Sequence, residues 1–168
     1  MASGNRVWVI DTSSILEVRR KLPRPHQQTV YSKLDGCVND GILVYPKHVL
    51  GELERAANDK ATDLPYQWTK RNEARATRFG SLFDEVKKVL AQVPKIIDPD
   101  KLGVEEADPY VLALATYLAS QGNIVTVVTE ERKDRPDKMS MNTACGLLGL
   151  LCLPMSAFLA QQGIWPQS

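Results

Sequence analysis

Acidic residues stand where the predicted strands end and the predicted helices begin. Two apolar runs, residues 7–10 and 124–128, stop on carboxylates, and two helical patterns carry carboxylates near their amino ends. In a parallel sheet with right-handed crossovers, the carboxyl ends of strands and the amino ends of the following helices face one edge. We therefore expect four carboxylates to converge there, those of Asp11, Glu52, Asp108 and Glu131, with Glu130 as the alternative to Glu131.

Carboxylates that converge in this way indicate a bound cation. Like charges in a dry pocket oppose one another, so these acids cannot all stay ionised unless a cation joins them. Donor sets made only of oxygen favour Mg²⁺ or Mn²⁺ over zinc. No residue in the pattern is typical of a covalent nucleophile. The pattern therefore indicates a metal site that could activate water.

Each acid also has a plain structural interpretation. Asp11 could cap the helix that follows it, unless one of the two serines at positions 13–14 does so. Asp108 precedes a proline, and aspartate before proline is a common helix start. Glu52 alone would be interpreted as an exposed helix residue, and the two glutamates after the run at 124–128 could lie in an exposed turn.

The elements that must position these acids alternate along the chain. Apolar runs predict strands at residues 7–10, 42–45, 96–97, 124–128 and 150–153. Apolar residues at helical spacing predict helices at residues 14–21, 26–38, 47–58, 66–92 (broken at Gly80), 109–120, 142–148 and 156–162. This alternation predicts an α/β fold in which helices flank a central, mainly parallel sheet of four to five strands, an α/β/α sandwich.

Length and composition limit the remaining choices. The 168 residues suffice for a single domain, 1–168, with a strand-helix core over 6–153 and a last helix over 154–163. The formal net charge of +1 indicates no nucleic-acid or membrane partner by itself. The three cysteines form no CxxC pair, and the longest apolar stretch, 147–153, is too short to cross a bilayer. We expect a soluble, cytoplasmic protein with no membrane partner.

The acidic positions lie in four segments that resemble the motifs of PIN-domain nucleases. These segments match the family in order and spacing: Val9-Ile10-Asp11-Thr12-Ser13-Ser14, Val49-Leu50-Gly51-Glu52-Leu53, Ala107-Asp108-Pro109-Tyr110-Val111-Leu112-Ala113 and Val127-Val128-Thr129-Glu130-Glu131. The chain is most similar to small prokaryotic PIN proteins, which include the toxins of type II toxin–antitoxin pairs. The resemblance implies a PIN-like fold and a Mg²⁺- or Mn²⁺-dependent endoribonuclease that hydrolyses RNA. It also implies an antitoxin protein and a second copy of the chain as partners. The alternative is a PIN-like module that binds RNA or protein without turnover.

The resemblance also implies roles for individual residues. Asp11, Glu52 and Asp108 would bind the metal, and Glu131 would be the fourth acid. The family has Thr-x-Asp at the fourth motif, where this chain has glutamate at position 131. A glutamate reaches further than an aspartate, so the fourth acid is one of three residues, Glu130, Glu131 or Asp134.

Hydroxyl residues beside these acids are expected to support them. Thr12 or Ser13 would hold the Asp11 carboxylate, and Thr129 would orient the fourth acid. These roles too are implied by the resemblance.

Basic residues offer candidates for nucleic-acid binding. On a continuous helix over 66–92, Arg71, Arg75 and Arg78 would share one face, where they could bind phosphates or pair with nearby acids. Arg132 and Lys133 directly follow the fourth motif, in a charged loop over 132–140 that we expect to be exposed. These five positions are the predicted nucleic-acid contacts.

Overall fold

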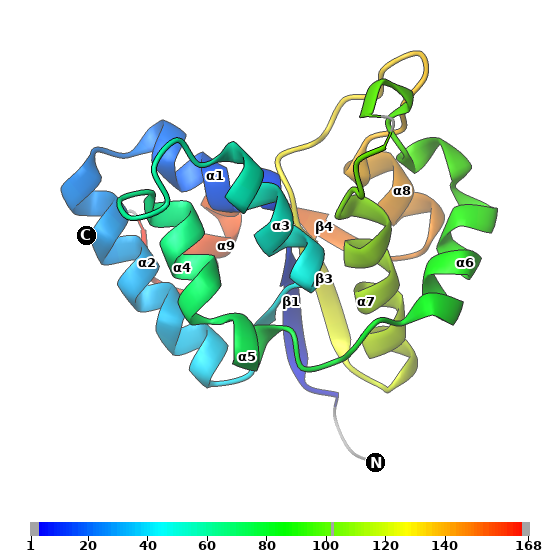
Figure 1. The fold of residues 1–168 in the computed structure, drawn as a ribbon. Coiled ribbons are helices and arrows are strands. Elements are labelled where there is room, and N and C mark those ends of the chain that lie inside the picture. The colour runs from blue at the N-terminus through cyan, green and yellow to red at the C-terminus, as the bar shows by residue number, and fades with distance from the viewer. Residues whose placement is uncertain (1–3, 102, 166–168) are drawn as a thin grey trace.

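Four short parallel strands form the centre of the structure (Figure 1). This computed structural model describes residues 4–101 and 103–165. The strands lie in the order β2-β1-β3-β4, with bounds β1 (Arg6–Ile10), β2 (Leu43–Val44), β3 (Ile124–Val128) and β4 (Leu151–Leu153). Every pairing between them is parallel, so their carboxyl ends reach one edge of the sheet. The predicted sheet of four to five strands is confirmed, with four strands in the described residues.

The register of the two central strands places two predicted site segments side by side. β1 pairs with β3 from Arg6 opposite Ile124 to Ile10 opposite Val128. The pairing continues one residue further, because the Asp11 N–H donates to the Val128 carbonyl at 3.1 Å. The chain leaves β1 and β3 at this point, between the two central strands, where ligands bind in open α/β sheets.

The helices connect the strands and cover both faces of the sheet. Figure 1 shows α1, α2, α4 and α9 on one side of the sheet and α6, α7 and α8 on the other. The described α-helices are α1 (Thr12–Lys21), α2 (Arg24–Asn39), α3 (Lys47–Ala56), α4 (Leu64–Arg71), α5 (Glu73–Ala76), α6 (Phe83–Gln92), α7 (Asp108–Ser120), α8 (Met141–Leu147) and α9 (Met155–Gln161). Two short 3-10 helices, η1 (Pro94–Ile96) and η2 (Pro99–Lys101), precede α7.

One continuous hydrophobic core fills the space between these layers. Trp8 of β1 packs against Phe158 of α9, with 5.6 Å between ring centroids. Val9 and Ile10 are fully buried, as expected for a parallel strand that is covered on both faces. The fold is therefore the predicted α/β/α sandwich.

The strand predicted at residues 96–97 is wrong. Pro94 begins the 3-10 helix η1 there, because its fixed backbone angle suits the first turn of a helix. Ile96 is buried in the core, whereas Ile97 is 44% exposed. Two apolar residues after a proline were too short a pattern to separate a strand from a helical turn.

The helix predicted over 66–92, with a break at Gly80, is right about that break and wrong before it. Gly80 lies between α5 and α6, but a further break at Asn72 separates α4 from α5. The buried Asn72 amide donates to the Trp68 carbonyl and to Asp35 Oδ1, both at 2.8 Å. Such side-chain bonds compete with the helical backbone pattern. The helical face expected for the three arginines at 71, 75 and 78 therefore does not exist.

Among the described residues, no helix combines the length and the apolar character that crossing a membrane requires.

Candidate functional site

Asp11 is fixed at the end of β1 by three hydrogen bonds. Its Oδ1 accepts from the Ser13 hydroxyl at 2.7 Å and from the Ser14 N–H at 3.0 Å. Its Oδ2 accepts from the Thr129 hydroxyl. Asp11 is therefore the cap of α1, and the expectation that a serine at 13–14 could take this position is wrong. The residue is 2% exposed, and its side chain is also among those that line a cleft at the sheet edge.

Ser13 and Thr129 tie the two central strands together at this point. The Ser13 oxygen accepts from the Glu130 N–H at 3.0 Å, and the Thr129 oxygen accepts from the Glu131 N–H at 3.1 Å. The Thr129 hydroxyl thus holds the Asp11 carboxylate. Its described contact with Glu131 is to the backbone N–H of Glu131 and not to the Glu131 carboxylate. Of the two residues predicted to hold Asp11, Ser13 does so.

Glu52 extends from α3 and joins two other helices. Its Oε1 accepts from the Thr12 hydroxyl of α1, and its Oε2 accepts from the Ala107 N–H at 3.2 Å. Ala107 is the cap residue of α7. The contact therefore places Glu52 beside the residue that precedes Asp108.

Asp108 is the first residue of α7, and it is not the helix cap. Ala107 takes the cap position without a side-chain bond, so the capping interpretation of Asp108 is wrong. Its Oδ2 instead accepts from the Lys138 ammonium at 3.2 Å. The carboxylate is thus available to the cleft.

The three candidates for the fourth acid point in different directions. Glu131 lines the cleft, and its Oε1 accepts from Lys138 at 2.7 Å. Glu130 turns toward the start of α9, where it accepts from the Met155 N–H at 2.6 Å. Asp134 accepts from the Ser140 N–H at 2.8 Å, at the start of α8. Only Glu131 lies with the other three acids.

Lys138 lies inside the site, although its loop was expected to be exposed. It is 5% exposed, and its ammonium also donates to the Met139 carbonyl at 3.0 Å. The loop folds back locally, since the Arg135 N–H donates to the Lys138 carbonyl at 2.8 Å. The prediction is wrong for this residue because the charged sequence of the loop does not reveal which side chain turns inward.

The four acids line one open cleft of about 460 Å³. Three exposed cations stand at its margin: Arg20 of α1, Arg55 of α3 and Lys101 of η2. The remaining lining residues are Thr12, Ser13, Leu16, Ala56, Val104 and Lys138. The cleft therefore combines an acidic floor with a basic margin. Arg55 lies three residues after Glu52 on α3, a spacing by which the sequence could have indicated it.

Burial and mutual repulsion alter the protonation of two of these acids. Burial raises the pKa of Asp11 from 3.8 to about 6, although the bonds from Thr129, Ser13 and Ser14 favour the charged form. Burial, and then the charges of Glu131 and Asp11, raise the pKa of Asp108 well above its usual range. For Lys138, burial would lower the pKa, but Asp108 and Glu131 outweigh it and raise the pKa.

The donor set of the cleft fits an oxygen-preferring cation. Its acidic donors are carboxylates, and no histidine or cysteine is among its described lining residues. The raised pKa values of Asp11 and Asp108 indicate that ionising these two carboxylates costs free energy in this site. A bound cation would offset that cost. Within residues 4–101 and 103–165, no three or more acids, histidines or cysteines lie close enough together to hold a metal ion as they stand, so the four acids would have to move closer to bind one.

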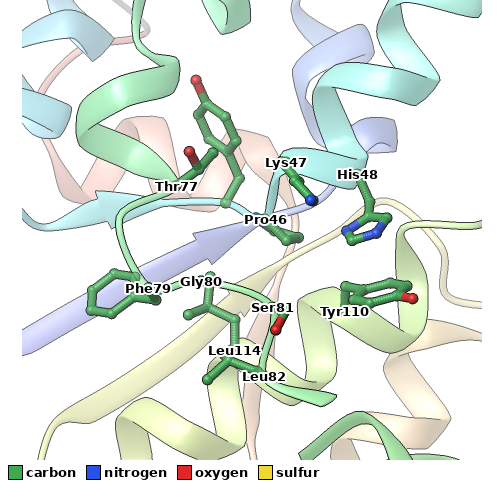
Figure 2. A pocket seen from close by; sticks show the side chains of 11 residues that line it. Pro46, Lys47, His48, Thr77, Phe79, Gly80, Ser81, Leu82, Tyr110 and Leu114 are labelled. Carbon is green, nitrogen blue, oxygen red and sulfur yellow. The ribbon is translucent and has the colours of Figure 1, made fainter.

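A second, smaller cavity lies on the other side of α3. Figure 2 shows the rings of His48 and Tyr110 facing each other there, and their centroids are 3.4 Å apart. Glu105 accepts from the Tyr110 hydroxyl at 2.6 Å and lies 3.1 Å from His48 Nε2. The cavity measures about 10 Å³, room for one water molecule at most. We interpret this cluster as a link that holds α3, and with it Glu52, against the start of α7.

The predicted nucleic-acid contacts do not line the acidic cleft. Arg71 forms an ion pair with Asp35 at 3.0 Å, and Arg75 donates to Asn39. The other three lie elsewhere: Arg78 over the ring of Phe79, Arg132 on Asn142, and Lys133 in the exposed loop. The structure instead brings Arg20, Arg55 and Lys101 to the acids.

The fold and the site together define an α/β protein with an acidic cleft at the carboxyl edge of a parallel sheet. A family model described as a domain of unknown function, DUF4411, matches residues 8–165, and the chain belongs to this family. No curated protein and no solved structure matches the chain.

Proposed function

We propose that this protein is a Mg²⁺- or Mn²⁺-dependent endoribonuclease of the PIN type. The observation that carries the proposal is the cleft in which Asp11, Glu52, Asp108 and Glu131 meet from four separate segments of the chain. Asp11 and Glu52 each have both carboxylate oxygens bonded by described neighbours, which fixes their orientation. Such fixed oxygen donors favour binding of a hard divalent cation.

The acids would hold the ion, and the hydroxyl residues would hold the acids. Asp11, Glu52 and Asp108 are the proposed ligands, with Glu131 beside them. When bound, the ion would lower the pKa of a water molecule and offset negative charge on the phosphate. Ser13 and Thr129 keep Asp11 oriented, because outer partners of this kind fix the geometry of metal ligands.

The basic margin supports a nucleic acid as the substrate, and the resemblance to PIN-domain nucleases favours RNA. Arg20, Arg55 and Lys101 line the same cleft as the acids and would contact the phosphates of a bound strand. In the proposed hydrolysis, the oxygen of water bonds to phosphorus, one bridging P–O bond breaks, and the leaving oxygen takes up a proton. The open shape of the cleft leaves room for a nucleic-acid strand to enter.

The resemblance to small prokaryotic PIN proteins supports a biological setting for this activity. We propose that the chain is the toxin of a type II pair, restrained by an antitoxin protein and active as a homodimer in the cytoplasm. Light scattering on the purified chain tests the dimer, for which we expect twice the mass of one chain; the mass of a single chain would contradict it.

Cleavage of a mixed pool of structured and single-stranded RNAs tests the proposal. We expect cuts with Mg²⁺ or Mn²⁺, none with EDTA, and none with Asp108→Asn in any metal. Folding of the variant is checked by circular dichroism. RNA binding without cleavage in every metal would contradict the proposal and support the alternative, a PIN-like binding module.

A further inference from the structure

One cation of the chain itself lies among the four acids. The Lys138 ammonium is 2.7 Å from Glu131 Oε1 and 3.2 Å from Asp108 Oδ2. Its third contact is the Met139 carbonyl at 3.0 Å, so each of its three N–H groups has an acceptor. It therefore contacts two carboxylates at once, as a cation bound between them would.

Lys138 is held in place by its own loop. The loop is anchored at both ends, since Arg135 pairs with Asp98 at 2.6 Å and the Met139 N–H donates to the Lys95 carbonyl at 2.7 Å. The Lys138 residue is itself buried. Withdrawal of the ammonium would leave Asp108 and Glu131 without their described counter-charge, which disfavours the movement.

The charges of the site limit how many ions it can take. Four ionised carboxylates balance two divalent ions, but Lys138 already offsets one of the four negative charges. A second divalent ion would give the four acids and Lys138 together an excess of positive charge. It would also compete with an ammonium for the same oxygens of Asp108 and Glu131.

We propose that Lys138 stands in place of a second metal ion, so that the cleft binds a single divalent cation. This inference rests on the proposed metal-dependent function and adds the number of ions to it. Asp11, Glu52 and Asp108 would hold the ion, and Lys138 would remain paired with Glu131. Lys138 is then a positioning residue that also supplies fixed positive charge.

Calorimetric titration with Mn²⁺ tests the number of ions. We expect one ion per chain for the wild type and two for Lys138→Met, which removes the charge and keeps most of the side-chain volume. Lys133→Met is the matched control, because it makes the same charge change in the same loop at an exposed position. It should bind one ion with the affinity of the wild type.

Each other result contradicts a defined part of the account. Two ions on the wild type, or one ion on a folded Lys138→Met, would overturn the role of Lys138 and leave the metal proposal standing. No binding to the wild type would overturn both. If Lys138→Met does not fold, Lys138→Gln replaces it, because its amide can still donate to Asp108 or Glu131; we expect two ions, and one ion would overturn the inference.

Discussion

Asp11 serves the fold and the proposed site with the same carboxylate. One oxygen caps α1 through Ser14, and the other faces Thr129 across the two central strands. Its burial is nearly complete, at 2% exposure. A buried acid holds its proton more tightly than an exposed one, so Asp11 makes the stability of the protein depend on pH.

We predict that Asp11→Asn changes this pH dependence. The folded-state pKa of Asp11 is raised from 3.8 to about 6, so the folded state binds the proton more tightly than the unfolded state. In metal-free buffer, the cost of ionising Asp11 begins as the pH rises above its unfolded pKa and is complete above its folded pKa. A shift of about two pKa units corresponds to about 3 kcal/mol of unfolding free energy.

Urea unfolding at pH 4 and pH 7, in EDTA, measures this effect. The stability of the wild type relative to Asp11→Asn should fall by about 2 kcal/mol between the two pH values, because part of the cost is already present at pH 4. A difference that stays constant, or that rises with pH, would show that burial does not govern the Asp11 carboxylate.

At the residue scale, the sequence predicted that the four acids lie at one edge and that Ser13 could hold Asp11, but it did not predict their other partners. Asp11 and Glu131 follow long apolar runs, so their place at the sheet edge could be predicted. The direction of Glu130, by contrast, depends on where α9 begins, and the inward turn of Lys138 depends on its loop. Both are contacts between segments distant in the sequence, which local patterns do not encode.

At the element scale, Glu130 replaces a missing helix cap. Pro154, which precedes α9, has no side-chain capping bond, and the Glu130 carboxylate instead accepts from the first N–H of that helix. This bond connects the segment after β3 to the segment after β4. The two adjacent glutamates thus have separate tasks, Glu130 in the fold and Glu131 in the cleft.

We predict that Glu130→Ala changes the stability of the protein and that Glu131→Ala changes its affinity for the metal. Loss of the acceptor for α9 should lower the unfolding free energy of Glu130→Ala by about 1 kcal/mol, the usual cost of a lost cap. Its affinity for Mn²⁺ should match that of the wild type. Glu131→Ala should bind Mn²⁺ more weakly, because the cleft loses one negative charge even though Glu131 is not one of the three proposed ligands. Thermal unfolding and calorimetric titration measure the two quantities. If Glu130→Ala lost the metal and Glu131→Ala kept it, the assignment of the fourth acid would be reversed.

Elements with long apolar patterns were predicted well, and those with short or mixed patterns were not. The runs that form β1 and β3 are apolar except at Arg6 and Thr126, and such runs are typical of buried parallel strands. The helix expected over 66–92 had no proline inside it, and its break at Asn72 depends on a bond to Asp35 of α2. A tertiary contact therefore ended a helix that local preferences would have continued.

At the scale of the whole molecule, the sheet order determines where the site forms. β1 and β3 are the two central strands, and the chain leaves them in opposite directions, toward α1 on one face and toward α8 on the other. The fold class and this edge could be predicted from the alternation of strands and helices. The basic margin could not, because Arg20, Arg55 and Lys101 come from three elements whose relative positions only the packing determines.

We predict that divalent cations stabilise the whole fold. A ligand that binds only the folded state, at about 100 times its dissociation constant, adds about 2.7 kcal/mol of stability. For a domain of this size, that raises the melting temperature by about 5–10 °C. Thermal unfolding in Mn²⁺ and in EDTA should show this rise for the wild type and little of it for Asp11→Asn. An equal rise in both proteins would place the ion elsewhere.

The most direct test of the central claim compares two glutamates of α3. Glu52 lies in the cleft, and Glu54, two residues later, is exposed and pairs with Lys60 at 2.7 Å. We would measure the cleavage rate of one defined single-stranded RNA in Mn²⁺ by the wild type, Glu52→Gln and Glu54→Gln. Since loss of a mere outer partner of a metal ligand already lowers activity by about 10- to 100-fold, Glu52→Gln should lose about 100-fold or more, and Glu54→Gln should cleave like the wild type. Cleavage by Glu52→Gln at the wild-type rate, or cleavage that persists in EDTA, would contradict a metal-dependent nuclease at the four acids.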